Sequence, residues 1–380
     1  MILMNVKKAF WIFAILTVLT MISDRILFVI FPNYLLEKQF SATEIGLIFS
    51  FASLILLISR TFIGKLSDIF GRKSILSLGL FIESISISFY PSLSRIYEFG
   101  IVKGLKEVAE TLKDSVIDAI QADVFKKKIR ARILAKLGTI YPLSRALAAL
   151  IGFLIVTYFS LAHGFYFAAF AIFLSFLIFT LFFKEKKIKA KKEFKISIKA
   201  YSKKFKIIAI IGFLIAINFN AAYFPGFFIL AKNLGISEGL LFVLLFFDYV
   251  ISAIFAWWSG RWIDKFGRAK TTALGSFLFS FFILLYPFSS SVIQFFLILI
   301  MVSIGFYIYR IAFKTILMDA TIKKVRGEQM GFAKTLQGVG DMIGPVLGGF
   351  LIDMISLSSA FYFAGFIGLI AAFLAYTVIK

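Results

Sequence analysis

The strongest constraint on the fold is a series of twelve apolar segments, each long enough to cross a lipid bilayer. A helix needs about 20 apolar residues to cross roughly 30 Å of hydrocarbon. Hydrophobic residues make up 61% of the 380 residues, against about 45–50% in soluble domains. The sequence therefore predicts an all-α membrane protein with twelve transmembrane helices. The segments lie near residues 9–31, 43–63, 74–91, 96–120, 133–158, 163–183, 207–231, 240–260, 271–288, 292–318, 329–352 and 360–379.

Basic residues are distributed unevenly between the predicted loops. Of the 42 Lys and Arg residues, 29 lie on the side that holds both termini, 3 lie on the other side and 10 lie within the segments. Cytoplasmic loops carry an excess of Lys and Arg. The asymmetry predicts a multi-pass protein of the cell (plasma) membrane with both termini in the cytoplasm.

The longest connection, residues 184–206, carries eleven lysines. Four apolar residues in it, Phe194, Ile198, Tyr201 and Phe205, repeat at helical spacing. Two interpretations stay open. The segment is either an amphipathic helix on the anionic inner leaflet or a solvated basic linker.

The composition excludes several function classes. The net charge of +22 is spread over loops, and no soluble module gathers it, so we expect no nucleic-acid partner. The chain has no cysteine and only one histidine, His163. We therefore expect no metal site, no cofactor and no enzyme activity built on Cys or His.

An internal repeat with one offset runs through the chain. Adding 196 to a residue number in the first half lands on a matching residue in the second, as for Asp68 and Asp264 or Tyr90 and Tyr286. The repeat predicts two parallel six-helix halves, residues 1–183 and 207–380, joined by residues 184–206. Because the first helix has an internal counterpart, we expect it to be structural and not a cleaved leader.

The loop after the second segment carries the most specific motif. Residues 64–73 read GKLSDIFGRK, and residues 260–268 repeat the pattern as GRWIDKFGR. This resembles the signature loop of the major facilitator superfamily, although Ile69 replaces its usual first Arg, and the resemblance covers the whole chain. Residues 340–349 resemble the glycine-proline motif that marks antiporters of that family when it stands in the fifth helix. The resemblance implies two six-helix bundles, each with inverted three-helix repeats.

The resemblance also implies conformational latches. Asp68 would face the start of the eleventh helix, and Arg72 would pair with Asp123. Gly64 allows close helix contact, and Gly71 allows a left-handed turn in a short connection. The second copy would use Gly260, Asp264, Gly267, Arg268 and Asp319.

The fourth predicted helix carries charges on one face. Within an arc of roughly 140° it holds Lys103, Lys106, Glu107, Glu110, Lys113, Asp114 and Asp118. Charges are costly in lipid, so the face must meet partner charges or a water-filled cavity. Two interpretations stay open: the charges line a substrate pathway, or pairs at spacing four, such as Lys103 with Glu107, neutralise each other.

The repeat exposes an inversion of charge. Asp114 corresponds to Arg310, Asp118 to Lys314, and Arg145 to Asp341. Such groups can pair within a half or across the halves, as a machine with two states requires. We expect Asp114, Asp118, Arg310 and Lys314 to form an inner gate, and Arg145 and Asp341 to lie on the substrate and ion pathway.

Other ionisable residues lie inside predicted helices. Asp24, beside Arg25, is the expected coupling residue, and its repeat counterpart is the uncharged Asn220. We place Asn218 on the same pathway. Glu83 and Asp248 have no cation at spacing three or four, so each is either paired across helices or protonated.

These features predict a secondary transporter that works by alternating access and is driven by a proton gradient, acting as a monomer on a small-molecule substrate. Export of drug-like or metabolic organic molecules is the first expectation. Uptake of a charged metabolite or peptide is the alternative. A receptor or scaffold on the same fold would bind without flux.

Overall fold

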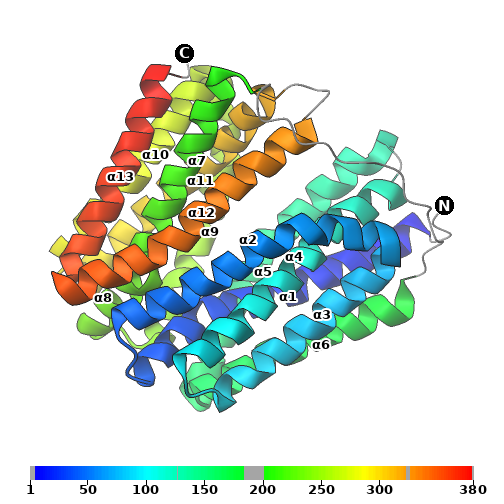
Figure 1. Cartoon of the computed structure of the whole chain (residues 1–380), viewed down its shortest axis with the longest axis horizontal. Helices are drawn as coiled ribbons and strands as arrows, with labels where there is room; N and C mark the ends of the chain where they lie inside the picture. The colour runs from blue at the N-terminus through cyan, green and yellow to red at the C-terminus, as the bar shows by residue number, and fades with distance from the viewer. Residues whose placement is uncertain (1–4, 126, 184–200, 322–325, 379–380) are drawn as a thin grey trace. The chain divides into compact units, whose positions relative to one another are not determined.

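The computed structural model describes residues 5–125, 127–183, 201–321 and 326–378, with most of their side chains. Within these ranges the elements are helices joined by short connections, and none is a strand (Figure 1). The elements are α1 (Val6–Glu37), α2 (Ala42–Phe70), α3 (Arg72–Phe89), η1 (Tyr90–Ser92), α4 (Ile96–Val124), α5 (Lys127–Tyr158), α6 (Leu161–Phe182), α7 (Lys203–Ala222), η3 (Tyr223–Phe227), α8 (Phe228–Asn233), α9 (Glu238–Phe266), α10 (Arg268–Leu285), η4 (Tyr286–Phe288), α11 (Val292–Asp319), α12 (Arg326–Met354) and α13 (Leu357–Val378).

Eleven of the twelve predicted segments each coincide with one helix of the described chain, and the seventh coincides with α7, η3 and α8 together. Eleven of the twelve segments, with α7 to α8 taken as one, are long and apolar enough to cross a membrane in the described part of the chain. The exception is α4, whose charged face lowers its mean hydropathy although its 29 residues suffice in length. The fold class predicted from the sequence is therefore confirmed, and α4 is the helix that departs from it in composition.

The seventh segment is broken where the sequence predicts a continuous helix. The regular α7 gives way to η3, in which Phe224 has non-helical backbone angles, and α8 completes the crossing. The physical reason is Pro225, which has no N–H to donate and disfavours a helical conformation at the residue before it.

The chain forms two compact units. The first contains the described residues within Met1–Tyr34, Leu54–Glu193 and Glu238–Phe246, and the second contains those within Leu35–Ser53, Phe194–Ser237 and Phe247–Lys380. Thus the beginning of α2 packs in the second unit, and the beginning of α9 packs in the first. In the second unit α7 lies against α12 and α13 (Figure 1).

Matching aromatic clusters show that the sequence repeat is a repeat in packing. In the first unit the ring of Tyr90 lies 4.7 Å from Phe31, 6.4 Å from Phe99 and 5.3 Å from Phe165, measured between centroids. At the offset of 196, the ring of Tyr286 in the second unit lies 5.9 Å from Phe227, 5.5 Å from Phe295 and 5.4 Å from Phe361. The same four positions therefore build the core at one end of each half.

Candidate functional site

Charged side chains from three helices meet inside the first unit. Helix α1 contributes Asp24, α3 contributes Glu83, and α4 contributes Lys106, Glu110 and Lys113. On α4 the charges recur every three or four residues, so they share one face. That face is turned toward α1 and α3.

The cations of α4 bind carboxylates both on their own helix and across helices. Lys103 Nζ donates to Glu107 Oε1 at 2.8 Å, and Lys106 Nζ forms a hydrogen-bonded ion pair with Glu110. Lys106 Nζ also lies 3.8 Å from Asp24 Oδ1. The spacing-four pair of Lys103 with Glu107 considered from the sequence is therefore present, as is that of Lys106 with Glu110, and the face also meets a partner charge on α1.

The pair between Glu83 and Lys113 is the most deeply buried part of the cluster. The Glu83 side chain is 0% exposed and that of Lys113 is 3% exposed, with 3.2 Å between Lys113 Nζ and the carboxylate. Of the two states left open by the sequence, pairing across helices is the one that the structure shows for Glu83. This glutamate lies outside the predicted site, because only its isolation within its own helix distinguished it.

Three carboxylates converge at this point. One oxygen from each of Asp24, Glu83 and Glu110 lies within 4.8 Å of the others. Carboxylate oxygens are ligands for hard cations, but the ammonium groups of Lys106 and Lys113 already lie against these oxygens. Since a bound metal ion would have to displace both lysines, the arrangement suits protons better than metal ions.

Asp24 is the carboxylate least well held by its surroundings. Its Oδ1 is buried and accepts no hydrogen bond from the described residues, and its distance of 3.8 Å to Lys106 Nζ exceeds a hydrogen bond. An ionised carboxylate that is buried is destabilised when its oxygens lack hydrogen-bond donors. A proton would therefore bind at Asp24 with the smallest loss of existing contacts.

The second unit replaces this charged cluster by aromatic side chains. At the offset of 196, Glu83 corresponds to Phe279 and Glu110 to Phe306, whose rings lie 5.4 Å apart. The counterpart of Lys113 is Tyr309, and that of Asp24 is Asn220. The two halves thus share a backbone plan but differ in the chemistry at equivalent places.

The predicted pathway amides of α7 have different surroundings. Asn220 Nδ2 donates to Asp341 Oδ1 at 2.9 Å, which connects α7 with α12. Asn218 is 0% exposed and donates to Ser280 Oγ at 2.9 Å, so it packs against α10. Arg25 and Arg145 are half-buried on α1 and α5. Arg310 and Lys314 are exposed on α11.

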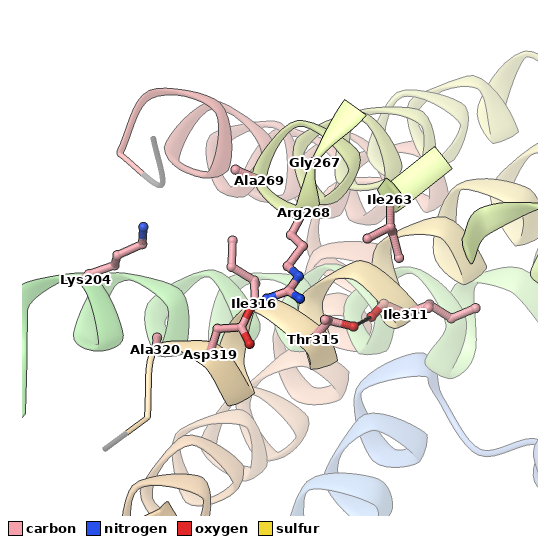
Figure 2. A pocket seen from close by; sticks show the side chains of 10 residues that line it. All are labelled: Lys204, Ile263, Gly267, Arg268, Ala269, Ile311, Thr315, Ile316, Asp319 and Ala320. Atoms are coloured by element: carbon pink, nitrogen blue, oxygen red, sulfur yellow. Dashed lines mark hydrogen bonds and ion pairs between the residues drawn. The ribbon is translucent and has the colours of Figure 1, made fainter. Parts of the chain in front are cut away.

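The second copy of the signature loop lines part of a cavity of about 840 Å³. Gly267 has φ 80°, a positive value that glycine adopts without strain, and it joins α9 to α10 in one residue. Arg268 pairs with Asp319 at the end of α11, as the resemblance implies, and both side chains are about half exposed. Figure 2 shows this pair in the cavity, which Lys204 of α7 also lines.

The first copy shows the same backbone at its glycine, since Gly71 has φ 87°. The side chains of several predicted latch and gate residues lie outside the described part, and so does the predicted pairing of Arg72 with Asp123. The residues concerned are Gly64, Asp68, Asp114, Asp118, Asp123, Gly260 and Asp264.

Comparison with known proteins decides the family. A family model described as the Major Facilitator Superfamily matches residues 13–247 and 208–380. The chain belongs to the major facilitator superfamily.

Relatives of this superfamily member span nearly its whole length. It is 22% identical to an uncharacterised MFS-type transporter of Methanocaldococcus jannaschii, with 99% of each chain covered. It is 23% identical to multidrug resistance protein 1 of Bacillus subtilis, covering 88% of this chain and 86% of that protein. A crystal structure of a nucleoside transporter matches with a TM-score of 0.84 at 13% identity, covering 99% and 100% of the two chains.

Membership makes the protein a multi-pass membrane transporter, which agrees with its apolar helices. Burial of charged side chains inside a membrane is energetically unfavourable, so the buried charges of this transporter point to a functional site.

Proposed function

We propose that this transporter exports small organic molecules in exchange for protons, by alternating access of one site to the two sides of the membrane. The observation that carries the proposal is the convergence of Asp24, Glu83 and Glu110 around Lys106 and Lys113. Buried ionisable groups inside membrane helices mark ion pathways and proton relays. No cofactor is needed, because the proton gradient supplies the free energy.

Protonation of Asp24 would change the charge balance of the cluster. With Asp24 ionised, Lys106 lies between Asp24, Glu107 and Glu110. With Asp24 neutral, Lys106 would be held by the two glutamates of its own helix, and the link between α1 and α4 would weaken. Protonation of Asp24 would thus alter the contact between α1 and α4, as a coupled conformational change requires.

The aromatic character of the second half supports an organic substrate. Phe219 stacks with Tyr223 at 4.6 Å and lies 5.6 Å from Phe306, between ring centroids. Aromatic rings bind flat apolar molecules through their faces. The sequence similarity to multidrug resistance protein 1 points in the same direction.

Proteoliposomes with an imposed pH gradient test this function directly. We expect a panel of hydrophobic organic solutes to move against the direction of proton flow, and charged metabolites or peptides to show no pH-driven flux. Movement of a charged solute together with protons would support the alternative function, uptake. That alternative rests on the presence of both positive and negative side chains on α4. Saturable binding with no flux of any solute under any gradient would indicate a receptor or scaffold and overturn the proposal.

Replacement of Asp24 tests the coupling step. Asp24→Asn imitates the protonated form, so we expect it to abolish pH-driven accumulation while solute binding and exchange persist. Asp24→Glu retains the carboxylate and should restore part of the coupling. Glu238→Gln, in the first turn of α9 and outside the cluster, is the matched control and should transport normally. Full gradient-driven transport by Asp24→Asn would remove Asp24 from the mechanism.

A further inference from the structure

A carboxylate near the end of α12 caps the beginning of α2. Asp353 Oδ1 accepts a hydrogen bond from the Ala42 amide at 3.2 Å, and Oδ2 accepts one from the Thr43 amide at 2.7 Å. Ser41 Oγ accepts from the Glu44 amide, and Glu44 Oε2 accepts from the Ser41 amide. The first three amides of α2 thus have acceptors, and two of these bonds come from another helix, 310 residues away in sequence.

Backbone contact accompanies this cap. A Cβ added to Gly349 would lie 2.2 Å from the Ala42 carbonyl oxygen, and one added to Gly46 would lie 2.3 Å from the Pro345 carbonyl oxygen. One turn further, the Val346 amide donates to Ser50 Oγ at 3.2 Å. The first three turns of α2 therefore lie directly on α12, all within the second unit.

The internal repeat supplies a second contact of the same kind without the charge. At the offset of 196, Asp353 corresponds to Thr157 of α5 and Thr43 to Gly239 of α9. A Cβ added to Gly239 would lie 3.6 Å from Thr157 Oγ1, so these residues also meet, within the first unit. The start of α2 and the start of α9 thus meet equivalent positions of α12 and α5, where α12 carries the carboxylate of Asp353 and α5 carries the neutral Thr157.

We propose that Asp353 is an outer latch, a releasable ionic cap that holds the first turns of α2 on α12 while the predicted outer side is closed. The proposal rests on the alternating access proposed above. A carboxylate is attracted to the positive N-terminal end of a helix, and its bonds to amides are stronger than those of a neutral acceptor. Because Asp353 is exposed, water can replace its bonds on opening, so the latch is reversible.

The cysteine-free chain allows a direct test by distance measurement. Spin labels at Lys38→Cys, just before α2, and Ile355→Cys, just after α12, report the separation of the two ends by pulsed electron resonance. In otherwise unchanged protein we expect a short and a long population whose ratio responds to pH and substrate. Asp353→Asn keeps the shape but removes the charge, and it should raise the ratio of long to short about fivefold.

Glu44→Gln is the matched control, because it neutralises a carboxylate at the same end of α2 that accepts from the local Ser41 amide and not from α12. It should leave the ratio unchanged. The latch is overturned if Asp353→Asn gives the same ratio as the parent. It is also overturned if Asp353→Asn and Glu44→Gln shift the ratio equally. Neither outcome bears on proton-coupled transport. A single distance in the parent at every pH and substrate concentration overturns alternating access together with the latch.

Discussion

At the scale of single residues, the pair of Glu83 and Lys113 shows what a buried charge requires in this protein. Both side chains are almost fully inaccessible, and each neutralises the other at 3.2 Å. Desolvation of two ions largely offsets their attraction, so such a pair adds little net stability. Removal of one partner is a different matter, since it strands the other in an apolar environment.

We therefore expect Lys113→Met to lower the free energy of unfolding by about 3–5 kcal/mol, because Glu83 loses its cation. The double variant Lys113→Met with Glu83→Gln should recover most of this loss. Thermal unfolding of the purified protein in detergent measures both. Equal losses in the single and double variants would show that packing, and not charge, sets the cost.

At the scale of helices, the glycines of α12 explain how three helices come into contact. Gly340, Gly344 and Gly348 recur every four residues and face α7, where added Cβ atoms would lie 2.7 Å, 2.8 Å and 2.2 Å from atoms of α7. Gly349 lies one position further around the helix and faces α2. The segment that resembles an antiporter motif thus serves as a close-contact surface toward two neighbours.

A comparison of two glycines in α12 tests this role. Gly348→Ala places a Cβ against the Ala221 carbonyl oxygen and should lower the free energy of unfolding by about 1–3 kcal/mol. Gly331→Ala meets nothing within 4 Å, and it should stabilise the helix by about 0.5–1 kcal/mol. Thermal unfolding of the two variants side by side checks the opposite signs. Stabilisation by both would contradict close packing of α12 on α7.

At the scale of the whole molecule, we infer an orientation in the membrane from the uneven distribution of Lys and Arg, 29 against 3 between the two sets of loops. Each positive charge near a membrane surface favours the cytoplasmic side. The proposal that both termini and residues 184–206 face the cytoplasm rests on this count.

Single cysteines in the cysteine-free background test the orientation. Lys187→Cys should react with an impermeant thiol reagent only from the cytoplasmic side, and Ser290→Cys, between η4 and α11, only from outside. Right-side-out and inverted vesicles distinguish reaction from the outside from reaction from the cytoplasmic side. Reaction of both sites from one side would be incompatible with the proposed topology.

The twelve helices, the internal repeat and the family were accessible from the sequence, for a physical reason. Hydrocarbon forces every backbone polar group to be satisfied within a helix, so apolar length alone reveals the crossings. An internal duplication preserves residue types at a fixed offset, as the clusters around Tyr90 and Tyr286 confirm. The charged face of α4 was predicted from helical periodicity, and the Arg268–Asp319 pair was implied by the resemblance to the family.

Only the tertiary structure decided which groups meet. Helical periodicity fixes the face that a side chain occupies, but not the helix that will lie against that face. Glu83 and Lys113 are separated by 30 residues, and Asp353 and Thr43 by 310, so no local pattern joins them. The docking of the start of α2 on α12 likewise depends on contacts between distant segments, whereas the break at Phe224 follows from the neighbouring Pro225. The sequence alone determined the helices, because a segment that crosses lipid must be apolar and helical. The tertiary structure determined which helices and side chains lie against one another, because each contact depends on two surfaces that are distant in sequence.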